Sequence, residues 1–261
     1  HLILEFTTSS STTYEYEKNL FMDRKTCRGA YKKDKVPSDL ILKIKNKLSH
    51  SLDLIELNEH YNLILSFLKE TTLVRMTDKS LFFELLDEVY SRKSEPHRKV
   101  GLPIDTLGVS SISALMLQVL KKLRLYFKYN FFHTASINES VVNPLKNTSH
   151  IFYLQAQSNK AEDWFLLGQN FQQLWWDFTV NSIVLQPFAN NLLIYNFLQN
   201  PEGGSYSRAH KSLLTKWNDQ LKKHSPINPE KAGILFRIGY AKKPCPMSPR
   251  KELIAFENSL P

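Results

Sequence analysis

The sequence is poor in cysteine. Its 261 residues include two cysteines, Cys27 and Cys245, which are far apart and form no CxxC arrangement. Such a pattern argues against a structural zinc site and against a disulfide scaffold, and it is typical of proteins in a reducing compartment. The eight histidines include no HxH or HxxxH pair, so we expect no metal site. From these features we predict a cytoplasmic protein.

Long apolar runs are also missing. No run reaches the roughly 18 to 20 residues that a membrane-spanning helix needs. Hydrophobic residues make up 42% and charged residues 23% of the chain, which is the balance of an ordinary globular protein. Residues 1–6 lack the basic flank and the small-residue cleavage motif of a signal peptide. The start at His1 is compatible with a domain of a longer protein.

The chain is basic, with a formal net charge of +9. Basic chains attract polyanions, so nucleic acid is the first partner to consider. The cations occur in short groups such as Lys32-Lys33 and Lys121-Lys122, and RNP-like, zinc-finger and Arg-rich segments are absent from the sequence. A solvated lysine-rich surface is therefore favoured over a nucleic-acid groove. A phosphate-bearing cofactor would need only a few of these charges.

The apolar pattern predicts an α+β protein. A helix opens at Pro37-Ser38, and further helices are predicted over residues 14–23, 59–71, 81–90, 113–128, 160–179, 190–199 and 206–222. Strands are predicted over 52–57, 151–157, 182–186 (ending at Pro187) and 233–240, with a long loop over 91–111. We expect one central mixed or antiparallel sheet wrapped by helices. Residues 1–13 are predicted to be a flexible N-terminal segment, and residues 14–261 a single domain.

Two of these helices carry specific predictions about burial. Over 113–128 we expect the buried side chains to be those of Leu115, Val119, Leu120 and Leu123. The helix over 160–179 has the clearest apolar stripe, formed by Ala161, Trp164, Gly168, Phe171, Trp175 and Phe178 at three- and four-residue steps. We interpret its tryptophans, with Trp176, as core or dimer-interface packing. The stripe is broad for the surface of a monomer, so we predict a homodimer.

Two segments resemble known sequence patterns. One is RKTCRGAY (24–31) followed by VPSDL (36–40), and the other is LFRIGYA (235–241) followed by SPRK (248–251). Together they resemble the FMN-dependent nitroreductase family over roughly residues 14–256. The loop Gly101-Leu102-Pro103 is most similar to a divergent branch that is sometimes fused to a ThiF-like adenylating domain. The resemblance implies a nitroreductase-like fold and a dimer with an exchanged C-terminal segment.

The resemblance also implies a cofactor and an activity. FMN would be the cofactor, and electrons would pass from NAD(P)H to a nitroaromatic, a quinone or a similar acceptor. Arg24, Thr26 and Arg28 alternate along an extended segment, so their side chains would project to one side. Guanidinium groups suit a dianionic phosphate because they bind it with two parallel hydrogen bonds. Thr26 would hold the ribityl chain or the phosphate, and Arg28 would reach the N1–O2 edge of the flavin.

Three further residues complete the implied site. Arg250 and Lys251 would close the phosphate site from the other end of the chain, and Gln186 would face the isoalloxazine. The hydride chemistry belongs to the cofactor, so no catalytic acid or nucleophile is assigned. The alternatives without a binding function are a solvated basic loop for residues 24–28 and an exposed tail for residues 250–251.

The sequence departs from the family at one motif. The family's Asn-any-Gln-Pro-Trp segment is missing, and residues 51–63 read SLDLIELNEHYNL, where Asn58 or Asn62 could take over. This departure motivates an alternative, a catalytically weak or inactive flavin-binding or dimerisation module. Another alternative is a peptide-azoline dehydrogenase, because Lys122 and Tyr126 have the Lys-any-any-any-Tyr spacing of that branch.

Overall fold

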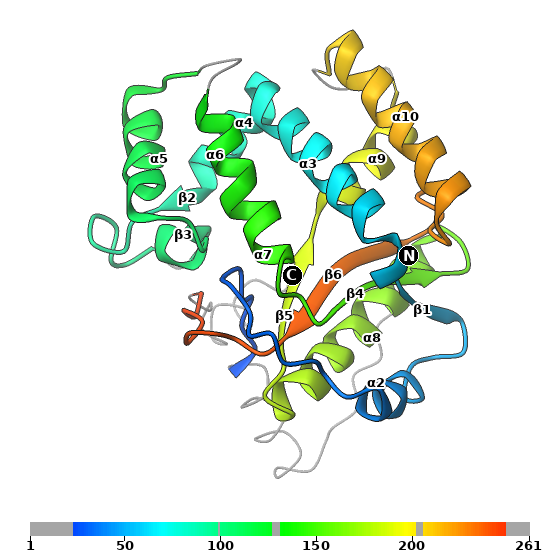
Figure 1. Ribbon diagram of the computed structural model, residues 1–261. Coiled ribbons are helices and arrows are strands. Elements are labelled where there is room, and N and C mark those ends of the chain that lie inside the picture. Colours follow the sequence, from blue (N-terminus) through cyan, green and yellow to red (C-terminus); the bar gives the residue numbers. More distant parts are fainter. Residues whose placement is uncertain (1–22, 99, 127–130, 202–205, 249–261) are drawn as a thin grey trace, which may run out of the picture.

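The computed structural model describes residues 23–98, 100–126, 131–201 and 206–248. The predicted flexible segment over 1–13, most of the predicted helix over 14–23, and the predicted site residues Arg250 and Lys251 lie outside these ranges. Within them, helices surround a four-stranded sheet (Figure 1). The prediction of an α+β fold with a central antiparallel sheet is confirmed.

The sheet has the strand order β1-β4-β6-β5, and each neighbouring pair is antiparallel. The strands are β1 (Leu52–Glu56), β4 (His150–Ala156), β6 (Gly233–Gly239) and β5 (Val184–Phe188). All seven residues of β4 are buried, because this central strand is covered on both faces. Five of these residues are apolar or aromatic, and the two polar ones, His150 and Gln155, form hydrogen bonds with Glu56 and with the Asn228 amide.

The strand β5 continues through Pro187, where the sequence predicted its end. Pro187 lies opposite Phe236 of β6. Proline has no N–H group to donate to a second neighbour, so it is tolerated at the edge of a sheet. The strand β5 is the last in the order of this sheet. No further described strand pairs with it on the side away from β6, so the missing N–H group of Pro187 removes no hydrogen bond to a neighbouring strand there.

One face of the sheet is covered by α2 (Ser38–Lys45) and α8 (Ala161–Val180). Phe152 and Leu154 of β4 point to this side and pack in one cluster with Trp175 and Phe178 of α8. The predicted stripe of α8 is confirmed in part, since its C-terminal half is buried while Ala161 and Gly168 are exposed. The buried half of the stripe is used in the protein's own core, so it does not require a partner.

The other face is covered by α3 (Tyr61–Thr77), α9 (Asn190–Gln199) and α10 (Arg208–His224), with the short η1 (Asn58–His60) and α7 (Asn143–Leu145). Ile151 and Tyr153 of β4 point to this side, in alternation with Phe152 and Leu154. The helix predicted over 190–199 has the predicted bounds, and α3 extends six residues beyond its predicted end at Thr71.

A smaller layer lies beside the sheet, at the left of Figure 1. It consists of α4 (Lys79–Glu88), the parallel strands β2 (Val89–Tyr90) and β3 (Leu102–Pro103), η2 (Ile104–Thr106), α5 (Ser111–Leu123) and α6 (Phe131–Ile137), which continues into η3 (Asn138–Val142). Its buried side chains form a cluster separate from the two sheet cores. The predicted loop over 91–111 therefore holds a short strand and one helical turn.

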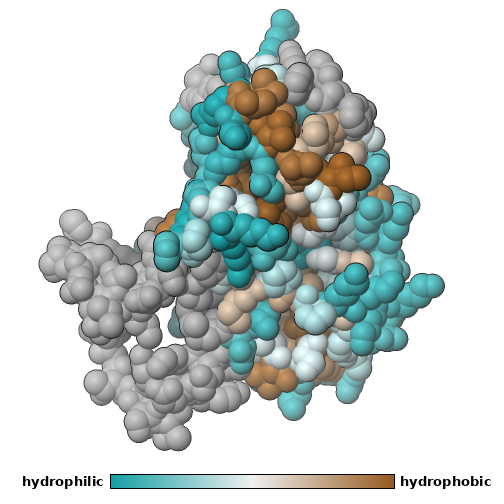
Figure 2. All heavy atoms as spheres, turned by 90° about the vertical axis from the view of Figure 1, so that its left-hand side faces the viewer, coloured by the Kyte–Doolittle hydropathy of each residue, from teal (hydrophilic) through white to brown (hydrophobic). Residues whose placement is uncertain are grey.

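The predicted buried face of α5 is wrong. Of the four residues named, Leu120 is 2% exposed, whereas Leu115, Val119 and Leu123 are 62%, 38% and 59% exposed. The helix turns Leu117 and Leu120 toward the small cluster and leaves the other predicted side chains at the surface. Figure 2 shows this side of the molecule, where apolar side chains reach the surface.

The cysteine pattern argued against a disulfide scaffold, but the structure contains one disulfide bond between the two cysteines. Cys27 and Cys245 are bonded, with their Cα atoms 5.3 Å apart although they are 218 positions apart in sequence. Beside them Tyr31 pairs with Ala241, and the Lys32 and Lys242 amides donate to Tyr240 and Ala30 at 2.8 and 3.1 Å. Sequence spacing carries no information about this contact, because it is created by the tertiary fold. The cysteine pattern therefore no longer supports the cytoplasmic prediction, which stays a prediction.

Among the described helices, none has the length and apolar character needed to cross a membrane.

The disulfide should contribute measurably to stability. We expect Cys245→Ser to lower the free energy of unfolding by about 2–5 kcal/mol, because the crosslink restricts the unfolded chain. The measurement is urea denaturation without reductant, and wild-type protein in reductant should match the variant. Peptide mapping that finds both thiols free in the native protein would contradict the bond.

Candidate anion-binding site

A cavity of about 370 Å³ lies where the segment after residue 26 meets the segment after β6. Residues 27–30 and 242–246 form two of its walls, and Asp105, Thr106 and Gly108 form a third. Arg28, Lys242 and Lys243 supply three cationic side chains to these walls. Among the described residues lining the cavity, Asp105 is the only carboxylate, and it already pairs with Arg92 at 3.4 Å. The cavity is therefore positively charged and suited to an anion.

Arg28 is held against the third wall. One of its terminal nitrogens donates to the Thr106 carbonyl at 3.2 Å, and the Thr106 hydroxyl in turn donates to the Pro103 carbonyl at 2.7 Å. Burial lowers the pKa of Arg28, but a guanidinium stays protonated at neutral pH. Arg28 thus brings a fixed charge to the cavity, whereas Lys242 and Lys243 are exposed.

Gly108 lets the loop approach the backbone of Arg28. Its φ is +72°, and a Cβ atom there would lie 2.9 Å from the carbonyl carbon and oxygen of Arg28. Glycine adopts this conformation without the steric cost that other residues incur. The close packing of residue 108 on residue 28 is therefore part of what shapes the cavity.

The structure places Arg24 and Thr26 differently from Arg28. Arg24 donates a hydrogen bond to Gln172 and stacks over the Trp175 ring, 4.6 Å from its centroid, and both of these partners lie on α8. Thr26 pairs with Leu185 of β5 in a parallel bridge. The segment thus runs along the edge strand, and the described contacts of Arg24 and Arg28 lie on different elements.

Gln186 is buried and accepts a hydrogen bond at 2.8 Å from Nε of Arg237. Arg237 is fully buried in β6, and sequence reasoning assigned it no role. The sequence does contain one indication of its importance, because Arg237 is the only charged residue in the strand GILFRIG. A charge in the middle of an otherwise apolar strand is unusual and indicates a specific set of partners.

Neither the asparagines considered for the missing Asn-any-Gln-Pro-Trp segment nor the Lys-Tyr pair lines this cavity. The Asn58 side chain accepts from the Ile151 amide at 2.9 Å and donates to Glu56 at 2.7 Å, so it joins β1 to β4. Asn62 is exposed on α3. The helix α5 ends at Leu123, and the Tyr126 hydroxyl donates to the Thr77 carbonyl. Lys122 and Tyr126 therefore do not share a helix, and the peptide-azoline alternative stays a prediction.

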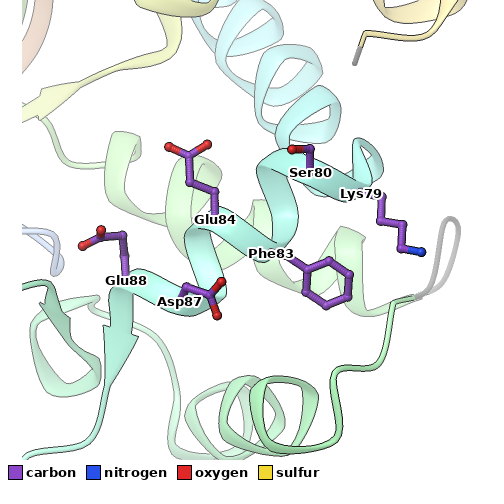
Figure 3. A pocket seen from close by; sticks show the side chains of 6 residues that line it. All are labelled: Lys79, Ser80, Phe83, Glu84, Asp87 and Glu88. Carbon is purple, nitrogen blue, oxygen red and sulfur yellow. The ribbon is translucent and has the colours of Figure 1, made fainter. Parts of the chain in front are cut away.

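A second depression lies on the outside of α4. Its side chains come from this one helix: Lys79, Ser80, Phe83, Glu84, Asp87 and Glu88 (Figure 3). Arg124 covers part of it, since it pairs with Asp87 and lies over the Phe83 ring at 4.5 Å from the centroid. An open row of acidic side chains on one helix is a solvated surface rather than a site.

No family model matches the sequence, and no curated protein matches it. Solved structures do match the fold. One of them is the FMN-dependent nitroreductase NfnB from Mycobacterium smegmatis, solved in complex with NADPH. It superposes with a TM-score of 0.50 at 12% sequence identity, and the alignment covers 93% of this chain and 97% of the NfnB chain.

The chain has the nitroreductase fold. Weaker matches include iodotyrosine deiodinase bound to FMN and 3-iodo-L-tyrosine, with a TM-score of 0.43 and 15% identity. That alignment covers 91% of this chain and 96% of the deiodinase chain. A nitroreductase with bound FMN from Bacteroides fragilis has a TM-score of 0.46 and 9% identity, and the alignment covers 90% of this chain and 94% of the nitroreductase chain. The predicted nitroreductase-like fold is confirmed, and the dimer with an exchanged C-terminal segment stays a prediction.

The packing of Gly108 can be tested with a matched pair of variants. Gly108→Ala should lower the free energy of unfolding by about 1–3 kcal/mol, because it combines a positive φ with overlap on Arg28. A Cβ atom at Gly168 on α8 would have no atom within 4 Å. Gly168→Ala should therefore raise the free energy of unfolding by about 0.5–1 kcal/mol. Urea denaturation measures both. Equal effects of the two changes would contradict the packing of residue 108 on residue 28.

Proposed function

We propose that this protein is an FMN-binding oxidoreductase that passes electrons from NAD(P)H to an oxidised small molecule such as a nitroaromatic or a quinone. The observation that carries the proposal is the basic cavity beside Arg28 in a nitroreductase fold. NfnB, whose fold is similar, is described as FMN-dependent and was solved with NADPH.

The charges of the cavity fit the phosphate of FMN. A dianionic phosphate needs cationic donors that are not already neutralised. Arg28, Lys242 and Lys243 line the cavity, and none of them forms an ion pair with a described carboxylate. Arg28 is the fixed member of this set because Thr106 holds it, and it is proposed to reach either the phosphate or the N1–O2 edge of the flavin. The cavity volume of about 370 Å³ falls within the usual range for small-molecule sites, about 300–1,000 Å³.

The remaining predicted contacts are kept as part of the proposal. Arg250 and Lys251 follow the cavity wall in sequence and are proposed to add positive charge to the phosphate site. Thr26 is proposed to bind the ribityl chain, and Arg24 to add charge from the side of α8. Gln186 is proposed to contribute to the floor beneath the flavin ring, where Arg237 fixes its side chain.

Bound FMN would supply the hydride chemistry itself. The chain's own residues bind and orient the cofactor, and their positive charge stabilises an anion in the cavity. No side chain is required to act as a nucleophile or a metal ligand. A homodimer and a cytoplasmic location remain further predictions, and sedimentation of the purified protein would test the first of them.

Arg28→Ala should weaken FMN binding at least several-fold, because it removes the fixed cation of the cavity. Fluorescence titration of FMN into the protein measures the dissociation constant. Arg124→Ala is the control, since Arg124 pairs with Asp87 on the surface. If both variants bind FMN like the wild type, the site assignment is wrong even though the fold is right.

The absorbance spectrum tests the activity itself. We expect the protein to take up FMN, to show the flavin band, and to lose this band when NADH or NADPH is added without oxygen. Addition of a quinone or a nitroaromatic should restore the band. Failure to take up FMN would exclude the proposal. Uptake of FMN without turnover on several acceptors would instead favour the non-catalytic flavin-binding module.

A further inference from the structure

Arg237 is a buried charge for which the described part of the chain provides no counter-ion. Its side chain has no solvent exposure, and among the described residues no carboxylate lies within ion-pair distance of it. Its hydrogen-bond partners are neutral: the Gln186 side chain, the Thr148 hydroxyl and the carbonyls of Pro144, Cys27 and Gly29. Burying an unpaired charge is costly, even when each N–H finds an acceptor.

The aromatic neighbour of Arg237 does not neutralise it either. The guanidinium carbon lies over the Tyr31 ring, 3.7 Å from its centroid. Burial raises the pKa of Tyr31 to about 12, although the charge of Arg237 opposes this shift. The hydroxyl of Tyr31 is therefore protonated at neutral pH, and it donates to the Cys27 carbonyl at 3.1 Å. The positive charge of Arg237 thus persists beneath the segment.

Two of the hydrogen bonds of Arg237 hold the backbone on either side of Arg28. One terminal nitrogen donates to the Cys27 carbonyl at 3.3 Å and to the Gly29 carbonyl at 2.7 Å. These carbonyls belong to the residues directly before and after Arg28. The Cys27 amide is fixed as well, because it donates to the Leu185 carbonyl at 3.0 Å. The orientation of Arg28 at the cavity therefore depends on Arg237.

Replacing buried ionic groups by apolar groups of similar volume is often neutral or stabilising. Packing alone therefore gives no reason for an arginine at this place. A guanidinium can instead bind several carbonyls in one plane and keep its charge at all physiological pH values, and both properties act on the neighbouring cavity.

We propose that Arg237 is a positioning residue of the site, which holds Arg28 at the cavity wall and adds an uncompensated positive charge beneath it. The proposal rests on the proposed FMN site. It implies that both the affinity for FMN and the reduction potential of the bound flavin depend on a residue that does not reach the cavity. A positive charge near the flavin stabilises its anionic reduced form more than its neutral oxidised form.

Two variants separate the two effects. Arg237→Lys keeps the charge, but its single nitrogen cannot replace the three guanidinium nitrogens that bind Gln186, Pro144 and the carbonyls of Cys27 and Gly29. It should therefore bind FMN at least tenfold more weakly, with a midpoint potential close to that of the wild type. Arg237→Gln removes the charge, so it should also lower the midpoint potential. A tenfold loss in the relative affinity for reduced FMN corresponds to about 30 mV for a two-electron couple. Should Arg237→Gln fail to fold, Arg237→Lys carries the test.

A double-mutant cycle distinguishes positioning from a general loss of structure. If Arg237 acts through Arg28, then Arg237→Lys should weaken FMN binding tenfold in the wild type but less than twofold in the Arg28→Ala background. Thermal denaturation is measured alongside, and Arg124→Lys on the surface serves as the matched control. Equal losses in the two backgrounds would overturn the proposal.

The outcomes separate this inference from the proposed function. If the wild type binds neither FMN nor inorganic phosphate, the proposed function fails and the inference fails with it. If Arg28→Ala weakens binding while Arg237→Lys and Arg237→Gln match the wild type in affinity and potential, only the inference fails.

Discussion

The structure depends on the meeting of two segments that are far apart in sequence. The segment over 27–32 pairs with the segment over 240–245, and Arg237 lies under the contact with its donors directed at the carbonyls of Cys27 and Gly29. Neither segment forms a regular strand or helix of its own. Their conformation is therefore set by tertiary contacts, and the cavity exists because these contacts bring Arg28 next to Lys242 and Lys243.

The sheet explains why the segments meet at this place. The strand β6 lies between β4 and the edge strand β5, so the chain leaving β6 emerges beside β5. The N-terminal segment runs along the same edge strand, where Thr26 pairs with Leu185. An edge strand offers unpaired backbone groups to a passing segment. The site is thus built on a rigid core while its own residues belong to irregular backbone, which is a common arrangement for binding sites.

Most of the core could be predicted from the sequence, because it is recorded in local periodicity. The strand β4 and the helix α9 follow directly from apolar runs and helical spacing. The buried face of α5 could not be predicted, since an apolar stripe does not reveal how wide its partner surface is. The disulfide and the role of Arg237 also escaped prediction. Both are contacts between residues more than 200 positions apart, for which a single sequence carries no local signal.

The bond between Cys27 and Cys245 makes a covalent ring of most of the described chain. A protease that cuts the exposed turn near residue 93 would release no fragment until the sulfurs are reduced. The ring also has an order of assembly. During synthesis the wall carrying Arg28 emerges first but stays open until residue 245 has left the ribosome, so the cavity closes only after all four strands of the sheet have been made.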